Sequence, residues 1–248
     1  MQGDVRWWRW WRWSCGDGGC PTRSSGRRSP GSVTAVILVG LTGGIGSGKS
    51  TVSSRLQARG AVIVDADAIV HEIQQPGSPV LAELAERFGP EVLTPDGALD
   101  RPAVAAKVFN DPEALAALNA IVHPAVGREM NGRVQEHRHS DRIVVLDIPL
   151  LTERPRPGLQ GIIVVDVPVD TQVERLVAHR GFDEADARAR IARQASRDER
   201  LATASVVVDN SGPPEALDAQ VDRVWAWLES LPQLSPEQVD DVSGAKRD

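Results

Sequence analysis

The chain has 248 residues, 41% of them hydrophobic and 25% charged, a globular composition that excludes a collagen-like chain, a disulfide scaffold and disorder throughout. No run approaches the roughly 18 apolar residues of a spanning helix, so we expect a soluble protein. The formal charge of −6 is uneven, because residues 1–35 hold six arginines and two aspartates while the rest is strongly acidic. An acidic body does not attract nucleic acid, so we expect no such partner.

The first 35 residues are not expected to belong to the fold. Trp and Arg alternate over residues 7–13, and a run of Gly, Ser, Arg and Pro follows. The segment lacks the apolar core and cleavage site of a secretory signal. Two interpretations stay open: a segment that binds an anionic membrane surface, or a disordered extension translated from upstream of the true start. We favour the extension and expect no stable membrane association. Both cysteines, Cys15 and Cys20, lie here, so the body has no disulfide, which fits a cytoplasmic location.

Short apolar runs alternate with helical patterns from residue 36 onward. The runs are rich in Val and Ile, which is typical of parallel strands buried on both faces. Strands are expected at residues 36–41, 61–64, 143–146, 162–167 and 205–208. Helices are expected at residues 49–59, 80–88, 103–109, 113–121, 124–136, 171–179, 184–201 and 214–231. The repeated strand–helix–strand order predicts an α/β fold, a five-stranded parallel sheet with helices on both faces.

Helix boundaries also have signals in the sequence. Asp170 and Asp183 are expected to be N-caps, and Gly60 and Gly181 to end helices. The interval between the second and third strands is too long for a simple crossover and shows helical patterning only. We therefore expect a helical insertion near the carboxyl ends of the strands, where open α/β sheets bind ligands. This insertion is predicted to be a substrate-binding element.

A phosphate-binding loop follows the first strand. The pattern G-x-x-x-x-G-K-[ST] is matched in full and continues into a helix by the run Gly43, Gly44, Ile45, Gly46, Ser47, Gly48, Lys49, Ser50, Thr51. Glycines let successive N–H groups point into one cavity, and the following helix N-terminus adds to them. Lys49 is expected to reach the β- and γ-phosphates, and the Ser50 hydroxyl to ligate Mg²⁺. The sequence therefore predicts a protein that binds a nucleoside triphosphate such as ATP.

Acidic residues follow the second and third strands. Asp65 and Asp67 stand two positions apart at the carboxyl end of a strand beside the loop. One could accept the proton of an attacking hydroxyl while the other orients the acceptor or a water on Mg²⁺. Equally, Asp67 could simply cap the next helix. Asp147 ends a Walker-B-like strand, where it could contact Mg²⁺ through water or make only structural hydrogen bonds.

Arginines are concentrated toward the end of the chain. Arg175 and Arg180 precede a helix that is itself rich in arginine. Arginine suits the charge spread over γ-phosphate oxygens, but most charges on such a helix are solvated. We expect only one or two of them to act in the chemistry. The guanine-reading string N-K-x-D is absent and no D-x-x-G follows the third strand, which argues against a switch GTPase and favours a small-molecule kinase.

In motif content the chain resembles the dephospho-CoA kinase family over roughly residues 36–231. The resemblance rests on the phosphate loop, on Val64-Asp65-Ala66-Asp67 and on shorter runs at residues 76–77, 97–101, 121–124, 149–151, 194–197 and 209–212. It implies a P-loop core, a helical CoA domain at about residues 68–140 and a lid at about residues 175–195. Residues 232–248 would then form a polar tail. The implied reaction transfers the γ-phosphate of ATP to the ribose 3′-hydroxyl of dephospho-CoA.

The resemblance also implies roles for individual residues. Asp67 matches the family's proposed general base, with Asp65 beside it, and Lys49 matches the triphosphate site. Arg175 and Arg180 fall where the family supplies an ATP-contacting arginine. Contacts with the acceptor are implied for Asp67, His71, Asp100, Arg101 and His123.

Some of these assignments stay open. His123 could instead be a helix-entry residue before Pro124. The family usually has Arg at the position of His71, which implies a weaker or pH-dependent grip on the acceptor. Another P-loop nucleotide or sugar kinase, or a regulatory protein that binds ATP without turnover, remains an alternative. The oligomeric state is left open between a monomer and a small homo-oligomer.

Overall fold

The structure is a computed structural model that describes residues 36–243. The extension expected over residues 1–35 lies outside the described residues, as do residues 244–248. The described chain divides into two compact units, which are considered separately. One is Ala66–Asn131, here called the helical unit. The other consists of residues 36–65 and 132–243, and is called the core unit.

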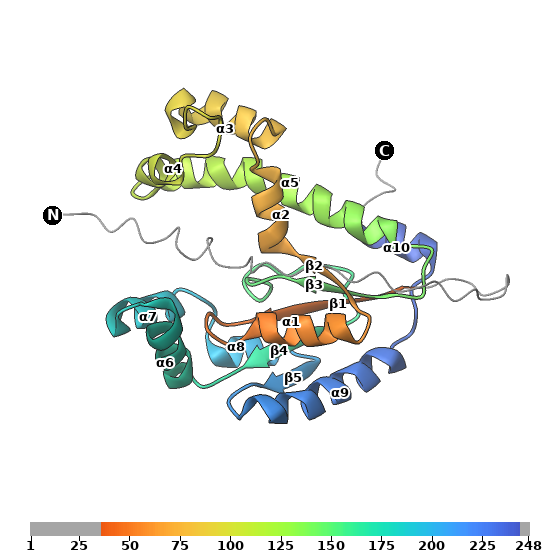
Figure 1. The fold of residues 1–248 in the computed structure, drawn as a ribbon. Coiled ribbons are helices and arrows are strands. Elements are labelled where there is room, and N and C mark those ends of the chain that lie inside the picture. Colours follow the sequence, from red (N-terminus) through yellow and green to blue (C-terminus); the bar gives the residue numbers. More distant parts are fainter. Residues whose placement is uncertain (1–35, 244–248) are drawn as a thin grey trace. The chain divides into compact units, whose positions relative to one another are not determined.

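A five-stranded parallel sheet forms the centre of the core unit (Figure 1). Its strands in chain order are β1 (Ile37–Gly43), β2 (Val62–Asp65), β3 (Ile143–Asp147), β4 (Ile162–Asp166) and β5 (Val206–Asp209). Across the sheet the order is β2-β3-β1-β4-β5, and each neighbouring pair is parallel. The α/β class and the parallel sheet expected from the sequence are confirmed.

The register of the sheet brings acidic residues to neighbouring strand ends. Asp65 at the end of β2 pairs with Asp147 at the end of β3, and Leu41 of β1 pairs with Asp147 from the other side. Asp166 and Asp209 pair in the same way at the ends of β4 and β5. Because parallel strands share one carboxyl edge, the loop that leaves β1 lies at the same edge as these carboxylates.

Helices of the core unit surround this sheet. They are α1 (Lys49–Ala58), α6 (Val169–Arg180), α7 (Glu184–Ile191), α8 (Arg197–Ala202), α9 (Pro214–Ser230) and α10 (Pro236–Ser243). The central hydrophobic cluster joins Val52 and Leu56 of α1 with Val221 and Leu228 of α9 and with alternate residues of β1. Full burial of such side chains contributes about 1.5–3 kcal/mol each, so this cluster holds α1 and α9 against the sheet.

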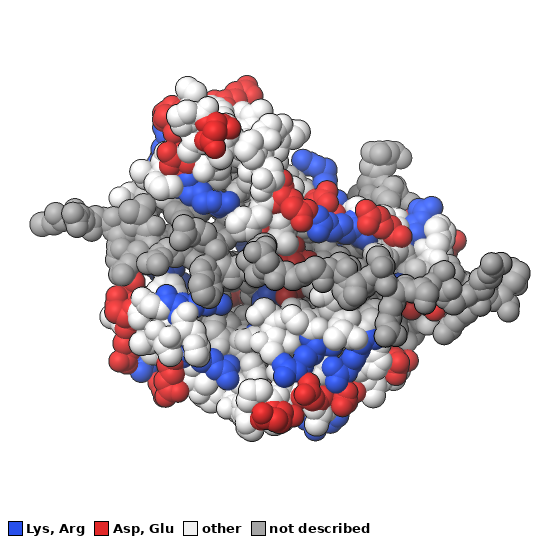
Figure 2. All heavy atoms as spheres, in the orientation of Figure 1, with Lys and Arg blue, Asp and Glu red and all other residues white. Residues whose placement is uncertain are grey.

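Exposed ion pairs run from α1 to α9. Arg55 Nε lies 2.7 Å from Asp218 Oδ1, and Arg59 forms an ion pair with Asp222. On the face drawn in Figure 2, positive and negative groups are interspersed. Exposed pairs contribute roughly 0–1 kcal/mol each, so the apolar cluster does more than these charges to fix α9.

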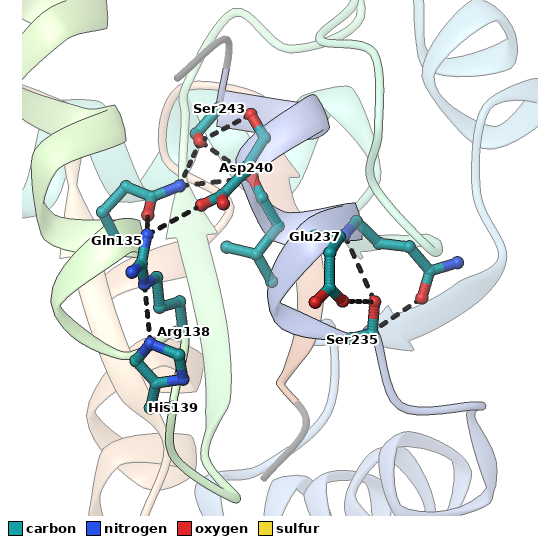
Figure 3. Close-up of polar contacts among 9 residues, drawn as sticks. Gln135, Arg138, His139, Ser235, Glu237, Asp240 and Ser243 are labelled. Carbon is teal, nitrogen blue, oxygen red and sulfur yellow. Dashed lines mark hydrogen bonds and ion pairs between the residues drawn. The ribbon is translucent and has the colours of Figure 1, made fainter. Parts of the chain in front are cut away.

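The C-terminal segment of the core unit packs against the rest of that unit through α10 and the residues just before it. Leu234, just before α10, pairs with Val36 through two main-chain hydrogen bonds of 2.8 and 3.2 Å, and Val239 is fully buried. The end of α5 (Pro112–Glu136) supplies Gln135, whose amide donates to Ser243 (Figure 3). Arg138 Nη1 then donates to Asp240 Oδ1 at 3.2 Å. The sequence predicted only a polar tail here, because Val239 and Val242 are the only aliphatic residues of α10 and give a weak helical signal.

The helical unit has its own core. Its elements are α2 (Ala66–Ile73), α3 (Pro79–Phe88), the short 3₁₀ helix η2 (Pro90–Val92), α4 (Arg101–Val108) and most of α5. Its apolar cluster includes Leu81, Leu84 and Val104. Ser78 and Asp100 cap α3 and α4, accepting from the N–H groups of Leu81 and Ala103. Among residues 36–243, no helix is both long and apolar enough to cross a membrane.

Two expected helix boundaries are wrong. The helices expected at residues 113–121 and 124–136 are one helix, α5, with Pro124 inside it. Proline removes one helical hydrogen bond, but Val122 and Ala125 on either side are buried in the apolar cluster, and this packing outweighs the break. The helix expected at residues 184–201 is two helices, because Ser196 and Glu199 form a capping box that starts α8 anew.

The expected caps are partly correct. Asp183 caps α7 by accepting from the Asp186 N–H, and Gly181 ends α6 with φ of 64°. Asp170 is not an N-cap: it lies in the first turn of α6, which starts after Pro168, and accepts from Arg188 at 3.2 Å. A carboxylate in the first turn still interacts favourably with the helix dipole. Asp170 therefore marked the correct helical turn, but not the N-cap position.

Candidate nucleotide-binding site

The predicted phosphate loop joins the end of β1 to the start of α1. The loop turns on two glycines with left-handed backbone, Gly46 (φ 78°) and Gly48 (φ 83°). A Cβ on Gly48 would collide with the side-chain amide of Asn210, so this position needs glycine for space as well as for conformation. Ser47 N–H donates to Gly44 O at 3.0 Å and closes the turn.

Side chains behind the loop fix the direction of its peptide groups. Gln172 Nε2 donates to Ile45 O at 2.7 Å, and Asn210 Nδ2 donates to Ser47 O at 2.7 Å. In a trans peptide the carbonyl and the following N–H point in opposite directions. The N–H groups of Gly46 and Gly48 therefore both point away from these supporting side chains. Successive N–H groups that converge in this way form a concavity that binds anions.

The N-terminus of α1 adds to this anion-binding character. Gly48 is its N-cap and can offer no side-chain cap, and the first turn of α1 contains no acidic residue. The first N–H groups of a helix lack helical partners, and the helix dipole places partial positive charge there. The loop and the start of α1 together suit a phosphate chain.

Lys49 is directed at the acidic end of β3. Its ammonium forms an ion pair with Asp147, whose side chain is 3% exposed. Burial raises the pKa of the Asp147 carboxyl; Lys49 opposes this shift and the carboxylate of Asp65 reinforces it. The sequence analysis did not predict that Asp147 pairs with the lysine of the phosphate loop. Its contact with Mg²⁺ through water stays a prediction.

Oxygen donors suited to Mg²⁺ gather at this edge of the sheet. Ser50 is exposed in the first turn of α1, and Asp65 and Asp147 are register partners at neighbouring strand ends. Within residues 36–243, no group of three or more His, Cys, Asp or Glu side chains could hold a metal ion by itself. Mg²⁺ commonly takes one or two protein oxygens and completes its shell with water and phosphate, so this donor set fits the ion bound together with a nucleotide.

Arg175 contacts the loop. Its guanidinium donates to Asn210 O at 2.7 Å and to Ser47 O at 3.4 Å, from the middle of α6. Arg180 is exposed at the last residue of the same helix, immediately before Gly181. The structure thus brings Arg175 to the loop backbone and leaves Arg180 at the surface of α6.

The remaining predicted residues lie in the helical unit. Asp67 and His71 are four positions apart on α2, so they share one face of that helix. Asp67 is inside the first turn and is therefore not the N-cap that one interpretation proposed. Asp100 is the N-cap of α4, and Arg101 is its first residue, whose burial lowers the pKa of the guanidinium. His123 is exposed within α5, so its interpretation as a helix-entry residue is wrong.

Sequence reasoning missed the supports of the loop. Gln172 was not singled out, and Gln194 and Asn210 were noted only within family motifs. A glutamine carries no recognisable spacing, so only the folded chain shows that it lies against the loop. Arg197 is a further case: its guanidinium pairs with Asp166 at 2.6 Å and ties α8 to the end of β4.

A parallel sheet with an anion-binding loop and a lysine after its central strand is the architecture of P-loop nucleotide-binding proteins, the class that includes the P-loop kinases. A family model described as dephospho-CoA kinase matches residues 37–215. Proteins named dephospho-CoA kinase from Thermobifida fusca and Streptomyces avermitilis are 52% and 50% identical to this chain. Each alignment covers 78% of this chain, and they cover 97% and 94% of the two relatives. The chain belongs to the dephospho-CoA kinase family.

Solved structures share the fold of this chain. A crystal structure of a protein from Thermus thermophilus superposes with a TM-score of 0.66 at 35% identity, covering 79% of this chain and 99% of that one. Dephospho-CoA kinase from Campylobacter jejuni superposes with a TM-score of 0.55 at 22% identity, covering 79% and 98%. The second likeness supports the fold.

Proposed function

We propose that this chain transfers the γ-phosphate of ATP to the ribose 3′-hydroxyl of dephospho-CoA, giving coenzyme A and ADP, the last step of coenzyme A synthesis. The observation that carries the proposal is family membership: the matched relatives are named for this activity and are aligned over almost their whole length. The arrangement of Lys49 and Asp147 beside an anion-binding loop supports it independently.

The phosphates of ATP would bind in the core unit. The N–H groups that point away from the supports of the phosphate loop, those of Gly46 and Gly48 among them, would hold the β- and γ-phosphates together with the ammonium of Lys49. Lys49 would exchange Asp147 for phosphate oxygens. Arg175 would stabilise negative charge on the transferred group, and Arg180 would assist if the α6–α7 region closes as a lid. Ser50, with Asp65 and Asp147, would hold Mg²⁺, which when bound neutralises charge that develops on the phosphates.

The acceptor would bind through the helical insertion at about residues 68–140. Asp67 would take the proton of the attacking 3′-hydroxyl as general base, with Asp65 as a neighbouring acid. His71, on the same face of α2 as Asp67, would contact the acceptor. Asp100, Arg101 and His123 would supply further acceptor contacts. We also propose a cytoplasmic location for the enzyme.

The test measures ADP release from ATP with and without dephospho-CoA, in the wild type, in Asp67→Asn and in the matched variant Asp111→Asn. The Asp111 carboxylate caps the start of α5 by accepting from the N–H groups of Glu113 and Ala114, both at 2.9 Å, and this residue serves as the control. We expect ADP release that depends on dephospho-CoA, that falls by about 100-fold or more in Asp67→Asn and that changes little in Asp111→Asn. Turnover without dependence on dephospho-CoA would reject the acceptor, and full activity in Asp67→Asn would reject the base.

A further inference from the structure

Both main-chain polar groups of Ile45 are held by glutamine side chains. Gln194 Oε1 accepts from Ile45 N–H at 2.8 Å, and Gln172 Nε2 donates to Ile45 O at 2.7 Å. Ile45 itself is 6% exposed, and Gln172 is 1% exposed. The two glutamines come from different elements, Gln172 from α6 and Gln194 from the connection between α7 and α8.

The connection that carries Gln194 is itself anchored on both sides. Ala195 N–H donates to Glu153 Oε1 at 2.7 Å, in the loop after β3. Arg197 forms three hydrogen bonds of 2.6, 2.9 and 3.1 Å with the carboxylate of Asp166 at the end of β4. Gln194 therefore reaches the phosphate loop from a segment whose position is fixed by the loop after β3 and by the end of β4.

Gln172 is buried for a reason other than packing alone. Its Oε1 is buried and has no hydrogen-bond partner within residues 36–243. An unpartnered buried amide oxygen costs free energy that a methionine or leucine of similar size would avoid. The presence of an amide at this buried position is therefore explained by the hydrogen bond that its Nε2 donates to Ile45 O.

The peptide that follows Ile45 is able to turn over. Its second residue is Gly46, whose backbone is left-handed and which has no side chain to resist rotation. A turned peptide would point Ile45 O, rather than Gly46 N–H, at the bound phosphates, and a carbonyl repels an anion. Donors that are held in place before the ligand arrives stabilise it without a further cost of reorganisation.

We propose that Gln172 and Gln194 are positioning residues that lock the Ile45 main chain, so that Gly46 N–H stays directed at the phosphates of ATP. The inference deepens the proposed function and rests on it, since it concerns the same phosphate loop. Neither glutamine touches the phosphates in this scheme. Their effect reaches the nucleotide through one peptide group.

Three single variants test the proposal: Gln172→Met, Gln194→Met and, as control, Gln160→Met. Gln160 is matched because its amide also bridges main-chain groups, accepting from Leu38 N–H at 2.7 Å and donating to Pro232 O, but at the start of β1 rather than at its end. The readouts are the Kd for ADP by calorimetry, the KM for ATP, the KM for dephospho-CoA, and the Tm without ligand.

We expect Gln172→Met and Gln194→Met each to raise the Kd for ADP and the KM for ATP by roughly 5- to 20-fold, the loss expected for one buried hydrogen bond that orients a donor. The KM for dephospho-CoA should change by less than about twofold. Gln160→Met should lower the Tm and leave the KM for ATP unchanged. The double variant should lose less than the product of the single losses, because both glutamines act on one residue.

The outcomes separate the two proposals. A wild type that binds no ADP would reject the proposed function itself. A wild type that binds ADP, with variants whose ADP affinity matches that of Gln160→Met, would overturn the positioning role alone. If Gln172→Met does not fold, Gln194→Met decides the question, because its side chain is only half-buried.

Discussion

The ammonium of Lys49 and the carboxylate of Asp147 form an ion pair although the two residues are 98 positions apart in the chain. The pair exists because β3 lies beside β1, so that the residue ending β3 lies at the edge where α1 begins. Asp147 therefore holds the lysine beside the phosphate loop. Under the proposed function, we expect ATP to replace Asp147 as the anionic partner of Lys49.

Replacement of Lys49 by Met should lower kcat/KM for ATP by about 100-fold or more, because the triphosphate loses its closest side-chain cation. The control is Lys107→Met, which removes a lysine that pairs with Glu91 at 2.7 Å in the helical unit. Steady-state kinetics with both variants check this expectation. Equal losses in the two variants would contradict a specific role for Lys49.

The raised pKa of Asp147 gives stability a defined dependence on pH. A carboxyl whose folded-state pKa lies above its unfolded value of about 3.9 contributes stability that is complete below the unfolded pKa and is lost as pH rises through the folded-state pKa. Asn cannot ionise. Asp147→Asn should therefore gain stability relative to the wild type as pH rises from about 4 to 8, measured by urea unfolding without nucleotide.

The control for this pH series is Asp218→Asn, at an exposed pair with Arg55. Its difference from the wild type should stay within about 0.5 kcal/mol over the same range. If Asp147→Asn instead loses stability relative to the wild type as pH rises, the pair with Lys49 outweighs burial.

Arg175 and Arg180 should differ in importance. Arg175→Met removes the hydrogen bonds to Asn210 O and Ser47 O and should raise the KM for ATP about tenfold. Arg180→Met, at the exposed end of α6, should raise it by less than about threefold. The same ATP titrations test both, and a larger effect at Arg180 would indicate that α6 moves when nucleotide binds.

Gly48→Ala should damage both the loop and its support. The new Cβ would collide with the Asn210 amide that holds Ser47 O, and φ of 83° is itself strained for alanine. Gly60→Ala shares the positive φ, here 109°, but its Cβ would meet nothing within 4 Å. Both variants should lose about 1 kcal/mol or more of stability, and only Gly48→Ala should also lose ADP binding.

Val239→Ala tests how much the packing of α10 contributes to stability. Val239 is fully buried, so its truncation should lower the free energy of unfolding by roughly 1–3 kcal/mol. The phosphate loop lies at the other end of β1 from the Leu234–Val36 pairing, so the KM for ATP should not change. Chemical unfolding and steady-state kinetics on one preparation measure the free energy of unfolding and the KM for ATP. A change in the KM for ATP would indicate that α10 influences the phosphate loop.

Local patterns located most of the fold. The Val-rich runs predicted all five described strands, since strands buried on both faces read as continuous apolar stretches. Boundaries were less accurate, as Pro124 and residues 192–196 illustrate. Proline argues for a helix end locally, yet buried neighbours kept α5 whole. The arginine-rich pattern of residues 184–201 predicted one continuous helix, whereas Ser196 is the N-cap of a second helix, α8.

The sequence by itself determined the α/β class, the phosphate loop and its lysine, because these depend on spacing within a few neighbouring residues. Only the tertiary structure decided that Asp147 holds Lys49, that Arg175 rather than Arg180 reaches the loop, and that two glutamines hold Ile45. These contacts join residues roughly 100 or more positions apart. They follow from the order of parallel strands and from helix docking, which depend on the packing of the whole core unit rather than on any local pattern.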